Sequence, residues 1–274
     1  MMKPPLYDAH NHLQDARIIL LSESLPALFQ AENIRKVVVN GSSEEDWPAV
    51  RALALKYPQV IPSFGYHPWY VKQRSVEWQK TLIQFLDEVP SAIGEIGLDR
   101  WIKDHDLAAQ EQVFLWQLNL AAKRNLPVSI HCLEAWGKMF DLLRSGPRPA
   151  CGFVLHSFGG PQEMIASLAE LGAYFSVPGY FANERKVRQR EAFRRVPPER
   201  LLIETDAPDQ PLPPELVLYP LADSTAGKPL NHPGNIVAVY RFAAELLNEP
   251  LEKLANRVES NFQTLFSSLI GQNQ

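Results

Sequence analysis

Six side chains of the types that bind metal ions each follow an apolar run with the pattern of a buried β-strand. Two of them, His10 and His12, stand two positions apart and therefore point to the same side of an extended chain. In a barrel of parallel strands, the C-terminal ends of all strands meet at one mouth, where active sites are built. The sequence therefore predicts that all six converge there: His10, His12, Glu95, His131, His156 and Asp206.

The types of these side chains limit the chemistry. Imidazole and carboxylate ligands without thiolate fit divalent ions such as Zn²⁺, Mg²⁺ or Mn²⁺. The two oxygens of Glu95 can bridge two ions, so the set indicates a two-metal centre that activates a water molecule for hydrolysis. Asp206 can also accept the proton of that water as general base. Asp8 shares the face of His10 and His12, and we expect it to orient a ligand histidine.

Each position also has a purely structural interpretation. The histidines could be hydrogen-bonded core residues, Glu95 could be a buried ion-pair partner, and Asp206 could cap the loop before Pro208. Cys132 reads as a small buried residue beside a ligand, not as a nucleophile. Function is favoured because histidines end neighbouring strand candidates at equivalent points.

The runs that carry these residues alternate with helical segments. Such alternation predicts parallel pairing through β-α-β crossovers, and eight strands fit a closed (β/α)8 TIM barrel with an extra C-terminal helix. The expected strands are 6–11, 35–40, 60–66, 91–96, 127–132, 152–156, 173–177 and 200–205. The expected helices are 22–32, 44–57, 76–88, 106–125, 134–144, 161–171, 184–195, 234–247 and 251–268.

Two segments carry more specific expectations. In helix 106–125, Val113, Trp116 and Leu120 form a stripe that can pack on the barrel, whereas Gln112, Gln117 and Lys123 can face water. The proline-rich stretch 207–233 is longer than ordinary loops and directly follows Asp206, so we expect it to form a wall or lid at the mouth. No linker is evident, and residues 1–274 are predicted to form a single domain.

Bulk composition excludes several classes of protein. The 274 residues are 46% hydrophobic and 21% charged with a net charge of −4, so attraction to nucleic acid would have to be local. Two cysteines fit a reducing compartment, and no signal-peptide or membrane-spanning run is present. We therefore expect a cytoplasmic protein with no membrane attachment, and no obligate protein partner is evident.

Several motifs resemble those of the TatD-like metal-dependent hydrolases, a (β/α)8 branch of the amidohydrolase superfamily. The resemblance runs from Tyr7 to Phe266. Its motifs are Asp8-Ala9-His10-Asn11-His12, Gly65-Tyr66-His67-Pro68, Gly94-Glu95-Ile96-Gly97-Leu98-Asp99, Gln117 through Ala121, Pro127 through His131, His156-Ser157-Phe158-Gly159-Gly160 and Glu204-Thr205-Asp206-Ala207-Pro208.

The resemblance implies a role for each matching residue. His10, His12 and Asp206 would hold one ion, His131 and His156 the other, and Glu95 would bridge them. His67, Asp8 and Glu204 would contact the substrate or support the ligands. Family members are typically metal-dependent deoxyribonucleases, often 3′-to-5′ exonucleases, and some relatives deacylate aminoacyl-tRNA. DNA or a nucleotide-like molecule is the implied substrate.

Departures from the family pattern affect the choice of substrate. An arginine common two residues after the fifth-strand histidine is Leu133 here, and a late Arg-Asn-Glu-Pro motif appears as Leu230-Asn231-His232-Pro233. Lys228, Arg100 or the run Arg185 to Arg190 could replace the lost cations, although that run reads more readily as a solvated helix face. The leading hypothesis is a two-metal phosphodiesterase. The alternatives are hydrolysis of a carboxylic ester or amide, such as aminoacyl-tRNA, and a non-catalytic metal-stabilised binding barrel.

Overall fold

Eight apolar runs form the strands of one parallel sheet, in the order β1 to β8 along the chain. The computed structural model describes residues 3–223 and 227–270. The strands are β1 Leu6–Asn11, β2 Ile34–Asn40, β3 Val60–Phe64, β4 Ala92–Asp99, β5 Val128–Leu133, β6 Phe153–Leu155, β7 Ala173–Pro178 and β8 Leu201–Glu204. Every one of these residues except some in β2 and Leu133 is buried, as expected for strands covered on both faces.

The sheet curls until its last strand lies beside its first. At the joint, the Asp206 N–H donates to the His10 carbonyl at 2.9 Å, and the His12 N–H donates to the Ala207 carbonyl at 2.7 Å. The Asp8 carboxylate, at the same joint, accepts hydrogen bonds from the N–H and the hydroxyl of Thr205 at 3.0 and 2.6 Å. The predicted (β/α)8 barrel is confirmed, and its closure brings β1 and β8 together.

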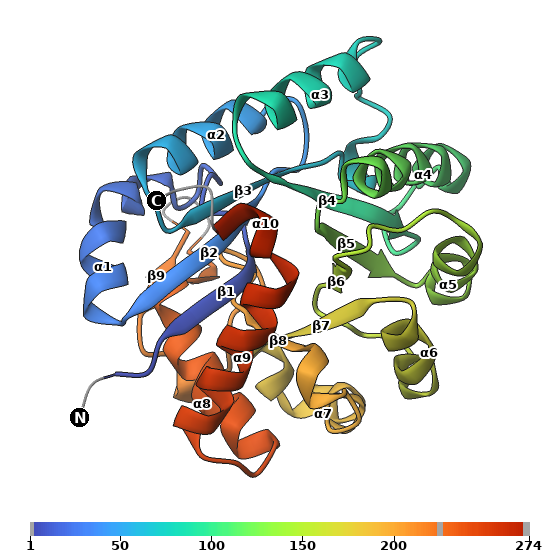
Figure 1. Ribbon diagram of the computed structural model, residues 1–274. Coiled ribbons are helices and arrows are strands. Elements are labelled where there is room, and N and C mark those ends of the chain that lie inside the picture. Colours follow the sequence, from blue (N-terminus) through green and yellow to red (C-terminus); the bar gives the residue numbers. More distant parts are fainter. Residues whose placement is uncertain (1–2, 224–226, 271–274) are drawn as a thin grey trace.

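Helices connect the strands and surround them (Figure 1). They are α1 Leu25–Ala31, α2 Trp47–Lys56, α3 Trp78–Glu88, α4 Leu107–Arg124, α5 Trp136–Ser145, α6 Ile165–Glu170, α7 Val187–Phe193, α8 Ile236–Leu246, α9 Leu251–Leu265 and α10 Ser267–Ile270. The extra C-terminal helix is α9, which contacts β1 and β8, and its expected continuation to 268 breaks into the short α10.

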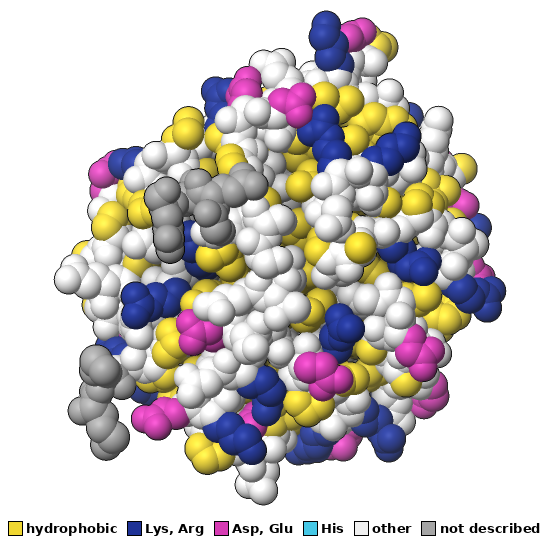
Figure 2. Space-filling view, in the orientation of Figure 1, with side chains coloured by type: hydrophobic (Ala, Val, Ile, Leu, Met, Phe, Trp, Pro, Cys, Tyr) yellow, Lys and Arg dark blue, Asp and Glu magenta, His cyan; other side chains and the backbone are white. Residues whose placement is uncertain are grey.

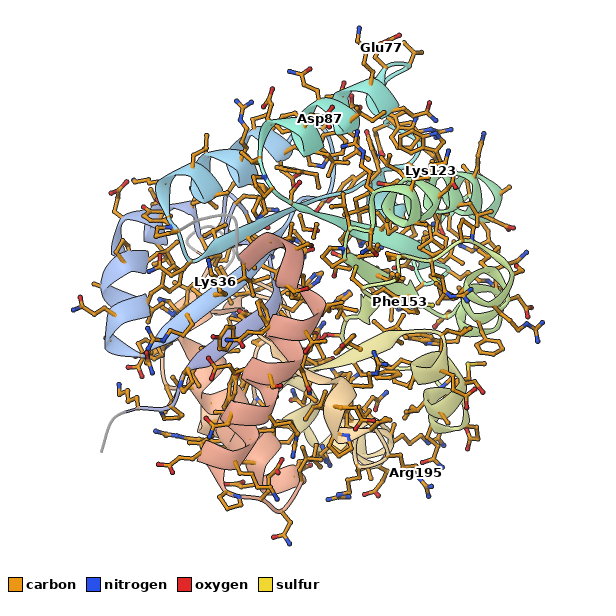
Figure 3. The ribbon with its side chains drawn as sticks, in the orientation of Figure 1. Lys36, Glu77, Asp87, Lys123, Phe153 and Arg195 are labelled. Atoms are coloured by element: carbon orange, nitrogen blue, oxygen red, sulfur yellow. The ribbon has the colours of Figure 1, made fainter. Side chains whose placement is uncertain are left out.

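The core fills the space inside and around the sheet. Figure 3 shows Phe153 of β6 in the interior, whereas Glu77, Lys123 and Arg195 project from the periphery. Figure 2 shows the face that carries α9 and α10, with lysines, arginines and carboxylates mixed over it and no histidine visible. The histidine cluster must therefore be sought elsewhere on the barrel.

One expectation for α4 is wrong. Gln117 does not face water but is fully buried, where its Oε1 accepts from the Tyr66 N–H at 2.7 Å. Gln110, two turns earlier on the same face of α4, is also buried and exchanges hydrogen bonds of 2.9 Å with the backbone N–H and C=O of Asp99. These side-chain amides provide hydrogen-bond partners for backbone groups where β3 and β4 end. The helical periodicity of the sequence could not predict this, because it assigns glutamine to the surface.

The proline-rich stretch after β8 is more ordered than an open loop. It contains an antiparallel pair, β9 Pro220–Ala222 and β10 Pro229–Asn231, within the described residues. Of its described residues, Asp209 and Gln210 in its first part line the mouth. The prediction of a wall is therefore met by these few residues, while the paired strands lie further along the segment.

Candidate metal centre and substrate cavity

His10 and His12 of β1 form the first group of donor atoms, together with Glu95 and Asp206. The two Nε2 atoms lie 3.3 Å apart, and they lie 3.4 and 3.3 Å from Glu95 Oε2. Asp206 Oδ1 lies 3.6 Å from His10 Nε2 and 3.5 Å from His12 Nε2. These donor atoms surround one space, which two imidazole nitrogens and two carboxylate oxygens could share as ligands of an ion.

His131 of β5 and the residue that follows β6, His156, form the second group, on the other oxygen of Glu95. Glu95 Oε1 lies 2.9 Å from His131 Nδ1 and 2.9 Å from His156 Nε2, and these two nitrogens are 3.3 Å apart. His67 Nε2 is 3.4 Å from the same oxygen. The rings of His10 and His156 stack at 4.0 Å, so the two groups adjoin.

Irregular strand pairing aims the ligands into the mouth. The register between β4 and β5 shifts between Ile93 and Ile96, and the Glu95 N–H donates instead to the Gly41 carbonyl at 2.8 Å. Such irregularities redirect a side chain. Beyond the shift, Gly97 has φ +157°, and a Cβ there would lie 1.9 Å from the His131 carbonyl oxygen, so only glycine allows β4 and β5 to approach this closely.

Hydrogen bonds from surrounding residues fix the rings. His12 Nδ1 lies 2.8 Å from the Asn40 carbonyl, so this nitrogen carries the proton and Nε2 presents its lone pair to the cluster. His10 Nδ1 lies 2.7 Å from Ser129 Oγ. His131 Nε2 donates to Asp99 Oδ2 at 2.8 Å, which leaves Nδ1 to face Glu95. Ligand histidines in metal sites are held in this way.

Sequence reasoning assigned no role to Asp99. It is fully buried at the end of β4, and it also accepts from the Trp69 indole N–H at 2.7 Å. Burial alone would raise its pKa, but the hydrogen bond and charge of His131 lower it to about 2. The available signal was spacing, because Asp99 lies four residues beyond Glu95 on the same strand.

Asp8 and Glu204 stand one layer behind the donors. The hydrogen bonds described for Asp8 go to Thr205, to the side chain of Asn11 and to the backbone N–H of His10, not to an imidazole ring. Asp8 therefore fixes the backbone beside His10 and Thr205 and does not orient a histidine ring as predicted. Glu204 Oε1 lies 3.7 Å from His156 Nδ1 and accepts from the N–H and hydroxyl of Ser157.

The charges of the cluster are strongly coupled. Burial raises the pKa of Glu95, but the charges of His156, His67 and His10 outweigh burial and hold it well below its usual range. Burial lowers the pKa of His10 to about 4. For His12, hydrogen bonding and charge from Glu95 outweigh burial and raise the pKa to about 9. The low pKa keeps Glu95 ionised, which is the state in which its oxygens can bind cations.

The donor set fits divalent ions. Glu95 Oε1 is buried and has no hydrogen-bond partner of proper geometry, although two imidazole nitrogens lie 2.9 Å from it. A buried polar atom in this condition calls for an explanation, and a shared cation supplies one. Three mutually close donor groups occur here: His10, His12 and Glu95; His67, Glu95 and His131; and His10, His156 and Glu204. Cys132 lies outside all three groups.

The cluster forms the floor of a cavity of about 1290 Å³, which is larger than pockets for drug-sized ligands. Among the lining side chains that the sequence did not suggest are the aromatic residues Trp69, Tyr70, Trp101 and Tyr180. Gln210 Nε2 donates to Asp206 Oδ2 at 2.6 Å. No sequence pattern marked these residues, because they come from separate loops that meet only at the mouth.

The residues that depart from the family pattern lie in different surroundings. Leu133 lines the cavity and is 38% exposed, so no cation stands there. Asn231 is fully buried and donates to the Thr205 carbonyl at 2.7 Å, while His232 stacks on Tyr219. Arg185 and Lys186 line the cavity from a 3-10 turn ahead of α7, and Arg185 is also exposed to solvent, so the expectation of a solvated helix face is only partly met.

An α/β barrel with such a cluster at its mouth defines a metal-dependent hydrolase. The sequence pattern of the TatD related DNase family matches residues 7–267. The chain belongs to this family. It is 30% identical to an uncharacterized metal-dependent hydrolase, YjjV of Escherichia coli K12, over 85% of this chain and 87% of that protein.

Two further comparisons agree with this assignment. The 3′-5′ ssDNA/RNA exonuclease TatD of Escherichia coli K12 is 30% identical over 85% of this chain and 88% of that protein. The crystal structure of Escherichia coli YjjV superimposes with a TM-score of 0.85 at 28% identity, covering 96% of this chain and 98% of the other. Among the described residues, no helix combines the length and apolarity needed to span a bilayer.

Proposed function

We propose that this protein is a phosphodiesterase that binds two divalent ions, Zn²⁺, Mg²⁺ or Mn²⁺, and removes nucleotides from an end of single-stranded DNA or RNA. One observation carries the two-ion part of the proposal: Glu95 directs one oxygen to each histidine pair. The nucleic-acid part rests on a relative of similar length that is named a 3′-5′ ssDNA/RNA exonuclease. The two free cysteines suggest a reducing compartment, which would be the cytoplasm.

Bound divalent ions would supply Lewis-acid neutralisation of the phosphoryl charge and lower the pKa of water near it. Asp206 is the proton acceptor: water attacks phosphorus, its proton passes to the Asp206 carboxylate, and the bond from phosphorus to the leaving oxygen breaks. Burial raises the pKa of Asp206 to about 7, in keeping with a proton-accepting role. Its other oxygen is held by Gln210.

His67 contacts the substrate in this proposal. Its Nδ1 accepts from the Trp69 N–H at 3.2 Å, so in the neutral ring Nε2 carries the proton and points toward Glu95. A ring with that tautomer donates and does not ligate. Its place beside Glu95 Oε1 suits donation to a phosphoryl oxygen, which would steady the charge that develops in the transition state.

The first test is digestion of end-labelled single-stranded DNA by protein reconstituted with each ion. We expect a ladder that shortens from one end, loss of cleavage with chelator, and loss in Glu95→Ala and Asp206→Asn. The surface change Asp141→Asn is the matched control for removing a carboxylate, since Asp141 forms an exposed ion pair with Arg144 far from the cavity lining. Full activity of metal-stripped Asp206→Asn would contradict the proposal.

A pair of small substrates tests the type of bond. Bis-p-nitrophenyl phosphate is expected to be hydrolysed and p-nitrophenyl acetate is not. The reverse result would assign the centre to carboxylic esters, such as aminoacyl-tRNA. Turnover of neither substrate nor DNA by protein with both ions bound would leave a metal-stabilised barrel without catalysis, and so would refute the proposal.

A further inference from the structure

The walls of the cavity above the metal centre differ in the chemistry of their side chains. Trp69, Tyr70 and Trp101, which we call the aromatic shelf, follow β3 and β4 and are 42%, 39% and 64% exposed. Large apolar side chains are rarely left so exposed together without a ligand or partner. The shelf adjoins the second histidine group, because the rings of Trp69 and His131 lie 6.3 Å apart and those of Trp69 and His67 5.1 Å apart.

The aromatic shelf is held in place. The Trp69 indole N–H donates to Asp99 Oδ2, and the backbone N–H of Trp101 donates to Asp99 Oδ1 at 2.7 Å. Asp99 also holds His131, so one carboxylate joins the shelf to a predicted metal ligand. The ring of Trp69 and the backbone of Trp101 are thus anchored to one carboxylate. Exposed aromatic rings offer bases a surface for stacking, and stacking requires bases that are not paired in a duplex.

The opposite wall is cationic. Tyr180, Arg185 and Lys186, the basic shelf, come from the segment after β7, and both cations lie over the Tyr180 ring, at 5.3 Å for Arg185 and 4.8 Å for Lys186. In the described part of the chain, no carboxylate forms a salt bridge with either cation. Burial and the charge of Arg185 lower the pKa of Lys186. Unlike the mixed charges in Figure 2, this is a local excess of positive charge.

A third side of the cavity is acidic. Asp15, Glu45, Asp46 and Asp209 line it, and its one cation, Arg17, is bound by two carboxylates at 2.7 and 2.8 Å. A polyanionic backbone cannot leave the cavity over this side without like-charge repulsion. The basic shelf is the side where repeated phosphates would be attracted, and the aromatic shelf offers them no charge.

From this arrangement we propose that the two shelves are separate subsites for one unpaired strand: the terminal base stacks on the aromatic shelf, and the phosphates that follow the scissile bond bind Arg185 and Lys186. The acidic side follows β8, β1 and β2 and flanks the path between the two shelves, so the backbone of the strand is not expected to run over it. This proposal rests on the proposed function and assigns its substrate contacts.

The test compares two substrates in three variants. For a labelled single-stranded 12-mer, Trp101→Ala is expected to raise KM roughly 5- to 100-fold, the usual cost of a lost stacking platform. Arg185→Ala with Lys186→Ala is expected to raise KM and to reduce the slope of log KM against log salt by about 1.4, or about 0.7 per lost phosphate contact. Arg188→Ala, on the exposed part of α7, is the matched control.

The second substrate, bis-p-nitrophenyl phosphate, has one phosphate and no strand beyond it, so its kcat/KM is expected to change far less than that of the 12-mer in the shelf variants. The subsite proposal is overturned if the shelf variants cleave the 12-mer like the wild type, or if they lose both substrates equally. Failure of the wild type itself to cleave either substrate would instead remove the proposed function and, with it, the subsites. An RNA 12-mer of the same sequence tests whether the shelves distinguish the sugars.

Discussion

The two donor groups on either side of Glu95 differ in composition and in support. The first has two imidazoles and two carboxylates, because Asp206 completes it, whereas the second has two imidazoles and one carboxylate beside His67. Behind the rings, the first group meets neutral oxygens of Ser129 and Asn40, and the second meets the carboxylates of Asp99 and Glu204.

This difference separates two tasks. Four donor residues suit an ion that stays bound, whereas three donors leave a position for water or a substrate oxygen. Carboxylates behind the second pair make its rings more basic and compensate for the missing fourth ligand. The comparison therefore predicts that the first group binds its divalent ion more tightly than the second group does. A set of variants can test this inequality.

The largest effect is expected from Glu95→Ala, because it removes a donor from both groups at once. Activity should fall at least about 10³-fold, as when transition-state charge loses its stabilisation, and the protein should retain less than one ion after dialysis. Elemental analysis beside the activity assay checks both. Two firmly bound ions in this variant would show that the groups do not share the glutamate.

Next in size is the contrast between His12→Ala and His131→Ala. The first should lose the tighter ion and the second the weaker one, so melting temperature in limiting Zn²⁺ should fall more for His12→Ala. At an ion concentration of 100 Kd, binding stabilises the folded state by about 2.7 kcal/mol, which is readily seen in melting curves. Equal losses in the two variants would remove the proposed inequality.

A smaller effect is expected from Asp99→Asn. The amide keeps the shape but loses the charge behind His131, so affinity for the weaker ion should fall about 10- to 100-fold, with the tighter ion unaffected. Competition with a fluorescent chelator measures both constants. Loss of the tighter ion instead would show that Asp99 serves the barrel as a whole.

The smallest effect is expected from Ser129→Ala, which removes a neutral hydrogen-bond partner from His10. A net cost of about 1 kcal/mol corresponds to roughly fivefold weaker binding of the tighter ion. The same chelator competition applies. An effect as large as that of Asp99→Asn would mean that charge behind the ring does not distinguish the two groups.

Sequence patterns predicted much of this molecule because strands buried on both faces are continuous apolar runs. Seven of the expected strands end within two positions of those observed, and β4 runs three residues further, to Asp99 instead of 96. The extension matters, because it carries Asp99 to His131. The contact between Asp99 and His131 depends on a shift of register inside β4, and the composition of the strand does not reveal that shift.

Side chains at the rim were harder to predict for a different reason. A helix over 184–195 would present its arginines to solvent, but α7 begins at Val187 after a 3-10 turn, which leaves Arg185 and Lys186 ahead of the helix and over Tyr180. Trp69 and Trp101 belong to different loops. Their proximity to the metal centre follows from barrel closure, which no local pattern encodes.

The hydrogen bond between the Asp206 N–H and the His10 carbonyl joins two residues that lie far apart in the 274-residue chain. A ribosome making 5–20 residues per second needs roughly 10–40 s to synthesise the polypeptide between them. Throughout that interval the nascent chain holds His10 and His12 without the carboxylate that completes their group. The metal centre can therefore become complete only after most of the protein has been synthesised.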